Sequence, residues 1–204
     1  MRKTALFLTI FPALSFFAVA VAAREPQTKT IFLDQKSDSN TWINREGLLY
    51  LAVNVFLTRG SDKQAYIPLE IGVANPGDKE VVLTRDSFTL IDQDGNTYPV
   101  TPPKEIRKNY GRLSFDRSKA ALTHTTVPVF NGFHFVRSQF EPNPRVSFET
   151  SNMVVDKLEL PSRFAMMDIL YFKMPSTGLK GKYFELRLTV KGLDEAPSIK
   201  FMVD

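Results

Sequence analysis

The chain has no cysteine among its 204 residues, and it has only two histidines and one tryptophan. The absence of cysteine excludes disulfide bonds, thiol catalysis and thiolate metal sites. It also excludes a lipid-modified amino-terminal cysteine. The two histidines, His124 and His134, lie in dissimilar surroundings and do not have the spacing of a zinc site. Function is therefore to be sought outside thiol and zinc chemistry.

A catalytic motif is also lacking. No serine stands in a G-x-S-x-G turn, and a triad of His134, Ser138 and an unassigned aspartate is a weak interpretation, because almost any exported protein offers such a set. Residues 92–96 (DQDGN) resemble the start of a calcium loop, but the twelfth position of an EF-hand would be Pro103 instead of glutamate. We interpret them as a hairpin turn, with weak calcium binding left open. We therefore expect that the protein is not an enzyme and that it binds no cofactor.

A large excess of one charge sign is absent as well. The formal net charge is +4, and removal of residues 1–23, which carry only Arg2 and Lys3 as charged side chains, lowers it to +2. A surplus this small does not predict binding to nucleic acid.

One long apolar run is present, and it lies at the amino terminus. Arg2 and Lys3 precede an apolar stretch over residues 5–19, and Val21-Ala22-Ala23 forms a small-residue cleavage signal. A cut one residue earlier is equally compatible with the sequence. We predict a signal peptide over residues 1–23 and export to the periplasm or the medium, with a retained membrane anchor as the less favoured alternative. No later segment is long and apolar enough to span a bilayer.

Residues 66–100 show the clearest β pattern. Ile67, Leu69, Ile71 and Val73 alternate with other residues, which places them on one face of a strand. Turn signals follow at residues 75–78 (NPGD) and 94–96 (DGN). Further strands are predicted over residues 49–57, 165–172, 183–190 and 199–203. At least seven strands in two sheets are expected, with Leu69 and Leu186 in the core and Trp42 as a core residue.

This pattern predicts an all-β, immunoglobulin-like antiparallel β-sandwich. The expected organisation is a signal peptide at 1–23, a polar amino-terminal lead-in at 24–47 and the sandwich at 48–204. Within the sandwich, residues 101–131 form one long connection that is partly helical, with a short helix over residues 115–122.

The connection is the candidate binding segment. It lacks strand alternation, it is long for a loop, and we expect it to be the least rigid part of the domain. Its basic residues are Lys104, Arg107, Lys108, Arg112, Arg117 and Lys119, against Glu105 and Asp116. These cations suit an acidic protein, an anionic lipid surface or a cell-wall polyanion. The alternative is that charge simply collects on an exposed loop. Four nearby phenylalanines, Phe130, Phe133, Phe135 and Phe140, are a second candidate, although core packing is the favoured interpretation for them.

The stretch Leu49–Asp204 resembles the telokin-like, immunoglobulin-like domains of exported bacterial proteins of unassigned function. The resemblance is carried by "IPLEIGVANPGDKEVVL", "FTLIDQDGNTYPV", "ILYFKMP", "KYFELRLTV" and "IKFMV". It implies a fold and supplies no catalytic residues. The long basic connection and the segment "HFVRSQFEPNP" depart from that pattern.

We therefore predict a non-catalytic exported domain that acts by binding a protein or a cell-envelope component. The alternative is a periplasmic carrier that holds an apolar small molecule between its sheets or under the connection. An envelope hydrolase is a distant third. A large closed apolar cavity would favour the carrier, and a filled core with an exposed patch would favour the binding domain.

Overall fold

The computed structural model describes residues 34–36, 40–123, 130–136, 138, 140, 155–176, 178–194 and 196–203. Among these residues the chain forms twelve strands, two α-helices and one 3-10 helix. The strands are β1 (Gln35–Lys36), β2 (Thr41–Asn44), β3 (Tyr50–Asn54), β4 (Tyr66–Ala74), β5 (Val81–Thr84), β6 (Phe88–Asp92), β7 (Thr97–Pro99), β8 (His134–Phe135), β9 (Lys157–Leu160), β10 (Phe164–Lys173), β11 (Lys182–Leu188) and β12 (Ser198–Val203). The helices are η1 (Arg85–Ser87), α1 (Pro103–Asn109) and α2 (Leu113–Thr123). The predicted signal peptide lies outside the described residues.

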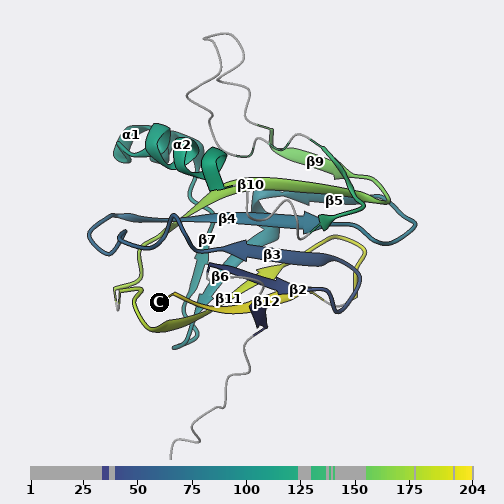
Figure 1. Ribbon diagram of the computed structural model, residues 1–204, viewed down its shortest axis with the longest axis horizontal. Helices are drawn as coiled ribbons and strands as arrows, with labels where there is room; N and C mark the ends of the chain where they lie inside the picture. Colours follow the sequence, from purple (N-terminus) through teal and green to yellow (C-terminus); the bar gives the residue numbers. More distant parts are fainter. Residues whose placement is uncertain are drawn as a thin grey trace, which may run out of the picture. The chain divides into compact units, whose positions relative to one another are not determined.

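The strands build two facing sheets and a small third one (Figure 1). Six strands pair in the order β1-β2-β3-β4-β10-β8, four in the order β12-β11-β6-β7, and β5 pairs with β9. Neighbours are antiparallel except β10 and β8, which run parallel. The predicted all-β antiparallel sandwich is thus confirmed, and the third sheet and the parallel pair are additions that the alternation pattern did not predict.

The core lies between the two large sheets. It takes Leu69 and Leu170 from the six-stranded sheet and Phe88, Leu186 and Phe201 from the four-stranded sheet. Leu69 and Leu186 are both 0% exposed, as predicted. Trp42 is also buried in this cluster, which confirms its expected core position. Burial of alternate residues on each strand drives the two sheets together, because each buried aliphatic side chain contributes about 1.5–3 kcal/mol.

The two large sheets are joined at both edges. At one edge the Thr101 N–H donates to the Tyr171 carbonyl at 2.7 Å, which ties the segment after β7 to β10. At the other edge the Asp34 N–H donates to the Lys200 carbonyl at 3.0 Å, which ties the segment before β1 to β12. These bonds satisfy backbone groups that an open sheet edge would leave exposed.

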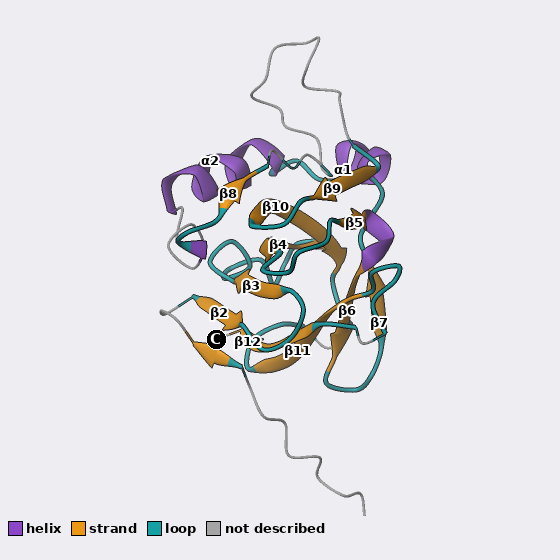
Figure 2. Cartoon of the chain, turned by 90° about the vertical axis from the view of Figure 1, so that its right-hand side faces the viewer, coloured by secondary structure: helices purple, strands orange, loops and turns teal. Residues whose placement is uncertain are grey.

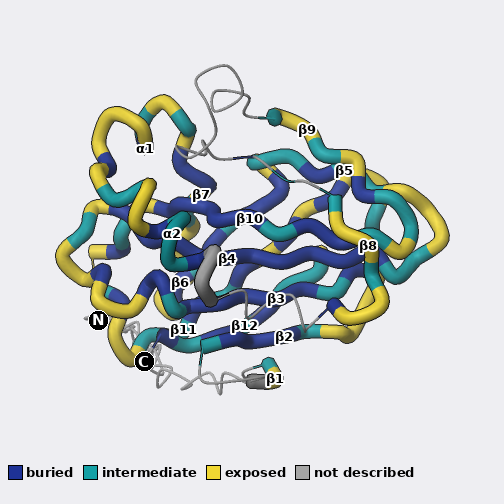
Figure 3. Tube along the Cα trace, turned by 45° about the horizontal axis from the view of Figure 1, so that its top comes forward, coloured by how far each residue is buried: buried dark blue, intermediate teal, exposed yellow. Residues whose placement is uncertain are grey.

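The outer face of the six-stranded sheet is also covered, so every residue of β4 is buried. Helices α1 and α2 lie over one part of it, on the side away from β11 and β12 (Figure 2). Phe130 covers another part, where its ring occupies the space that a Cβ at Gly72 would need. Figure 3 shows the result as a buried β3, β4 and β10 beneath an exposed α1. A third layer therefore covers this sheet.

One predicted boundary differs from the structure. The lead-in predicted at 24–47 already contains β1 and β2, which extend the six-stranded sheet, so the start of the sandwich predicted at residue 48 is too late. Sequence alternation is weak in these short strands, which explains the error. The short helix predicted over 115–122 is confirmed as α2, and α1 precedes it. Residues 124–129 of the connection lie outside the described residues.

Candidate functional site: a basic helical surface

Helix α1 carries the most exposed cations of the predicted binding segment. It begins at Pro103, because proline at the first helical position has a suitable φ and needs no N–H partner there. Its single buried side chain, Ile106, is 0% exposed and packs in the cluster beneath the helices. Arg107 and Lys108 lie in the last turn, where the helix dipole favours positive charge. Together with Lys104, both are exposed to solvent.

Helix α2 begins on a buried carboxylate. Asp116 is 0% exposed and accepts a hydrogen bond of 2.6 Å from the Tyr110 hydroxyl at Oδ2. The Tyr171 hydroxyl approaches the same oxygen at 3.5 Å, and the Arg112 guanidinium lies 4.0 Å from Oδ1. Burial raises the pKa of Asp116, although these partners oppose the shift. The pKa of the Tyr110 phenol is raised as well, by burial and by its bond to Asp116. The carboxylate thus fixes α2 to the tyrosines below it.

Arg117, the next residue on α2, forms an ion pair with β10. Its guanidinium lies 2.9 Å from Oδ1 of Asp168, whose side chain is 0% exposed. Oδ2 of Asp168 accepts bonds from the Ser138 hydroxyl at 3.0 Å and from the Phe140 N–H at 2.7 Å. A buried carboxylate needs such partners, because an unpaired buried charge costs several kcal/mol. Arg117 is therefore part of the folded framework of the molecule.

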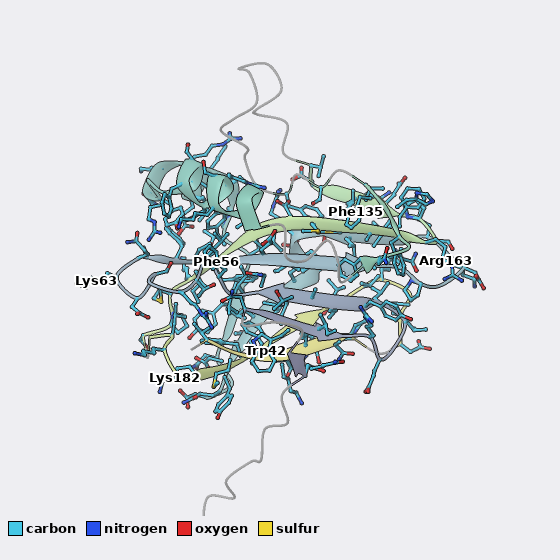
Figure 4. The ribbon with its side chains drawn as sticks, viewed as in Figure 1. Trp42, Phe56, Lys63, Phe135, Arg163 and Lys182 are labelled. Carbon is cyan, nitrogen blue, oxygen red and sulfur yellow. The ribbon has the colours of Figure 1, made fainter. Side chains whose placement is uncertain are left out.

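Arg112 and Lys119 are half-buried cations that stack on phenylalanine. The Arg112 guanidinium lies 4.9 Å from the ring centre of Phe115, and the Lys119 ammonium lies 5.4 Å from the same centre. Lys119 also lies 5.5 Å from the ring centre of Phe56, which follows β3 (Figure 4). Such contacts contribute about 0.5–1 kcal/mol at exposed sites. Phe115 remains 49% exposed, so this cluster presents an aromatic ring flanked by two cations.

The six predicted binding residues therefore divide into three groups. Lys104, Arg107 and Lys108 form an exposed row on α1, which we call the α1 cations. Arg112 and Lys119 flank the exposed Phe115. Arg117 is paired with Asp168 and its side chain is 16% exposed, so the structure gives it a contact within the fold, and its binding role stays a prediction. Phe56 and Phe115 are surface candidates that the sequence interpretation did not select, and their only signal was aromatic residues beside a basic segment.

The four phenylalanines of the second candidate also divide. Phe130 and Phe140 are 1% and 0% exposed, which confirms core packing for these two. Phe133 packs on Phe130 with the ring centres 6.3 Å apart. Phe135 is 44% exposed on β8. They do not form one continuous exposed aromatic surface.

The turn at residues 92–96 is built around Asp92. Its carboxylate accepts bonds from the N–H groups of Asp94 and Asn96, from the Asn96 side chain and from the Tyr98 hydroxyl. Burial alone raises the pKa of Asp92, but these bonds lower it, and the net direction is downward. Burial and the hydrogen bond to Asp92 raise the pKa of Tyr98 to about 12. The carboxylate thus serves the hairpin, as predicted.

The residues of the weak triad interpretation do not assemble in the required order. A triad needs the imidazole between the serine and the carboxylate. Here the Ser138 hydroxyl donates directly to Asp168, and the His134 ring packs on Phe164 at 5.3 Å between centres. Within the described part of the chain, no group of three or more histidine, aspartate or glutamate side chains is arranged to hold a metal ion. His124 lies outside the described residues.

Comparisons with known proteins place no function on this surface. No protein-family model matches the chain, and no curated protein matches it. The chain is similar to the yjhA protein of Bacillus subtilis with a TM-score of 0.39 and 12% identity, over 78% of this chain and 95% of that one. It is similar to the ycdA protein of the same species with a TM-score of 0.38 and 14% identity, over 84% and 39%. It is also similar to a functionally unknown protein of Listeria monocytogenes, with a TM-score of 0.33 and 12% identity, over 83% of this chain and 81% of that one. Likenesses this weak carry no argument.

Proposed function

We propose that the chain is an exported, non-catalytic β-sandwich that binds an anionic protein or cell-envelope component through the α1 cations. Export is inferred from the amino-terminal pattern over residues 1–23. Among the described residues, no helix has the length and apolar character needed to cross a bilayer.

One observation carries the proposal: cations of a single connection have two different environments. Arg117 is paired with a buried aspartate, whereas Lys104, Arg107 and Lys108 are exposed on a helix anchored by one isoleucine. A cation that stabilises the fold is paired with an acid of the same chain, as Arg117 is with Asp168. Exposed cations clustered on one helix favour association with a negatively charged surface.

The carrier alternative has less support among the described residues. It places an apolar ligand between the sheets or under the connection. The space between the sheets holds one cluster of packed, buried side chains. Under the connection, Tyr110 contacts Tyr66 and Tyr171, with ring centres 5.8 Å and 5.2 Å apart. Ile106 and Ile169 complete that cluster. Side chains packed in this way occupy the space that a ligand would need. The hydrolase alternative also lacks support, because the residues that the structure describes contain no assembled set of catalytic side chains.

The test is capture of envelope components by the immobilised protein, compared with the variant K104Q/R107Q/K108Q. At about 0.15 M salt we expect the wild type to retain a defined component and the variant to lose most of it. The Debye length at this salt concentration is about 8 Å, so exposed cations in contact with an anionic partner are still attracted to it, and the variant lacks three of them. Equal retention by both proteins would overturn the proposal.

A matched control removes three positive charges elsewhere. Lys79, Lys157 and Lys191 are exposed and lie away from α1, so K79Q/K157Q/K191Q changes the net charge equally. This control is expected to retain the component as the wild type does. Loss in the control as well would show that retention depends on net charge alone, which contradicts a surface on α1.

A further inference from the structure

The topology gathers additional cations at the end of the sandwich that carries α1. The Met174 N–H donates to the Ala65 carbonyl at 3.0 Å, which joins the β3–β4 loop (residues 55–65) to the β10–β11 loop (residues 174–181). Lys173, at the end of β10, lies 3.5 Å from Glu105 of α1. A small pocket of about 180 Å³ is lined by residues of both loops, among them Arg59 and Lys180. We call this surface, made of the two loops and α1, the basic end.

The basic end carries exposed cations from three separate segments of the sequence. Lys63 lies on the β3–β4 loop and Lys180 on the β10–β11 loop, and both are exposed. Half-buried Lys182 begins β11 at the same end, and Figure 4 shows it with Lys63 on the left. The α1 cations add three more. This surface has fewer acids than cations. Asp62 on the β3–β4 loop is exposed and lines the same pocket, and Glu105 of α1 accepts a bond from Tyr66 and pairs with Lys173.

The opposite end has a different charge arrangement. Arg85 pairs with Asp156, and its guanidinium also donates to the Phe140 carbonyl at 2.7 Å. Lys157 pairs with Glu159 at 2.6 Å. Exposed acids accompany the remaining cations there: Asp78, Glu80, Asp86 and Asp194. The positive field of the domain is therefore concentrated at the basic end.

The chemistry of these cations favours an extended anionic surface. Four of the exposed groups are lysines (Lys63, Lys104, Lys108 and Lys180), which are hydrated point charges without the bidentate geometry of arginine. Lys104 and Lys108 lie on α1, whereas Lys63 and Lys180 lie on two different loops, so the charges are spread over three segments. Phe115 adds an exposed aromatic ring between Arg112 and Lys119, and an apolar ring beside cations suits insertion at the boundary between lipid headgroups and acyl chains.

We propose that the basic end docks on the surface of an anionic phospholipid bilayer. The inference rests on the proposed function and names its partner class. Each lysine or arginine near such a surface contributes about 1 kcal/mol, which corresponds to about a fivefold change in partitioning. Residues of the two loops thereby join α1 in a single contact surface.

The test is co-sedimentation of the protein, recovered after export from an expressing host, with vesicles of two compositions. We expect binding to vesicles that contain about one third phosphatidylglycerol and no binding to pure phosphatidylcholine. The loop variant K63Q/K180Q/K182Q leaves α1 intact and is expected to reduce partitioning on the order of a hundredfold. K79Q/K157Q/K191Q is the matched control and is expected to change partitioning less than about threefold.

Several results would overturn this inference. One is an absence of binding to the anionic vesicles, and another is an equal loss in the control variant. Binding to immobilised polyphosphate without binding to vesicles would identify a soluble polyanion as the partner. If vesicle binding fails while capture of an envelope component still requires the α1 cations, the proposed function stands and the partner is of another class. If both fail, both proposals are wrong.

Discussion

Helices α1 and α2 come from the same basic connection, yet their cations have different environments. On α1, Lys104, Arg107 and Lys108 are exposed and only Ile106 is buried. On α2, Arg117 reaches the buried carboxylate of Asp168, and Asp116 is buried against Tyr110. The comparison teaches that a basic segment is not one functional unit. The strand beneath each helix decides which cations are needed for folding.

The difference follows from what each helix covers. The start of α2 lies over β10, which contributes Asp168 and Tyr171. A carboxylate in a buried strand needs a cation or several donors, and Arg117 supplies the charge. Helix α1 packs through Ile106 in the same cluster, and Lys104, Arg107 and Lys108 all lie on its exposed positions.

The largest expected effect is at Arg117. Substitution of Arg117→Met should lower the free energy of unfolding by about 3–5 kcal/mol, because Asp168 then loses its cation in a buried setting. Urea unfolding measures this value. The matched substitution Arg107→Met on α1 should change it by less than about 0.5 kcal/mol. Similar losses at both positions would remove the distinction between the two helices.

A smaller loss is expected at Tyr110. Tyr110→Phe removes the 2.6 Å hydrogen bond to Asp116 and leaves a buried carboxylate less satisfied, at a cost of about 1–3 kcal/mol. The control is Tyr183→Phe on the half-exposed face of β11, which should be nearly neutral. Thermal unfolding of both variants under the same conditions tests this. A neutral Tyr110→Phe would mean that Asp116 does not need this donor.

The next effect is at Arg112, which is partly a folding residue, because it contacts buried Asp116, and partly a surface residue, because it stacks on exposed Phe115. Arg112→Gln removes its contacts with Phe115 and Asp116, and the free energy of unfolding should fall by about 0.5–1 kcal/mol. Arg112 therefore does not belong in a variant that tests binding alone. A loss above about 2 kcal/mol would place it with Arg117 as a folding residue.

The smallest stability effect is expected for the α1 cations together. K104Q/R107Q/K108Q should unfold within about 0.5 kcal/mol of the wild type, because exposed charges contribute little to stability. The same urea curves provide the measurement. A cooperative loss of folding would show that these side chains pack against the domain.

The sequence predicted the sheets well because burial on one face leaves a period-two pattern. Leu69 and Leu186 were placed correctly for that reason. Two signals for the third layer were present but not interpreted. Gly72 within β4 marks the close approach of Phe130, and Asp168 within an apolar strand marks a buried ion pair.

The pairing itself could not be predicted from local sequence. Arg117 and Asp168 are 51 positions apart, and nothing near Arg117 distinguishes it from Arg107. The basic end is also a tertiary feature, because it combines Lys63, Lys180 and α1. Composition located the charges, and only the fold showed which of them share a surface.

The most direct test of the account is the salt dependence of retention of the captured envelope component. Wild type and K104Q/R107Q/K108Q are compared between about 0.05 and 0.5 M salt, a range over which screening of exposed charges increases strongly. Retention by the wild type is expected to fall steeply with salt, whereas the variant is expected to retain little and to show a nearly flat response. Parallel curves of equal height would contradict the claim that the α1 cations form the binding surface.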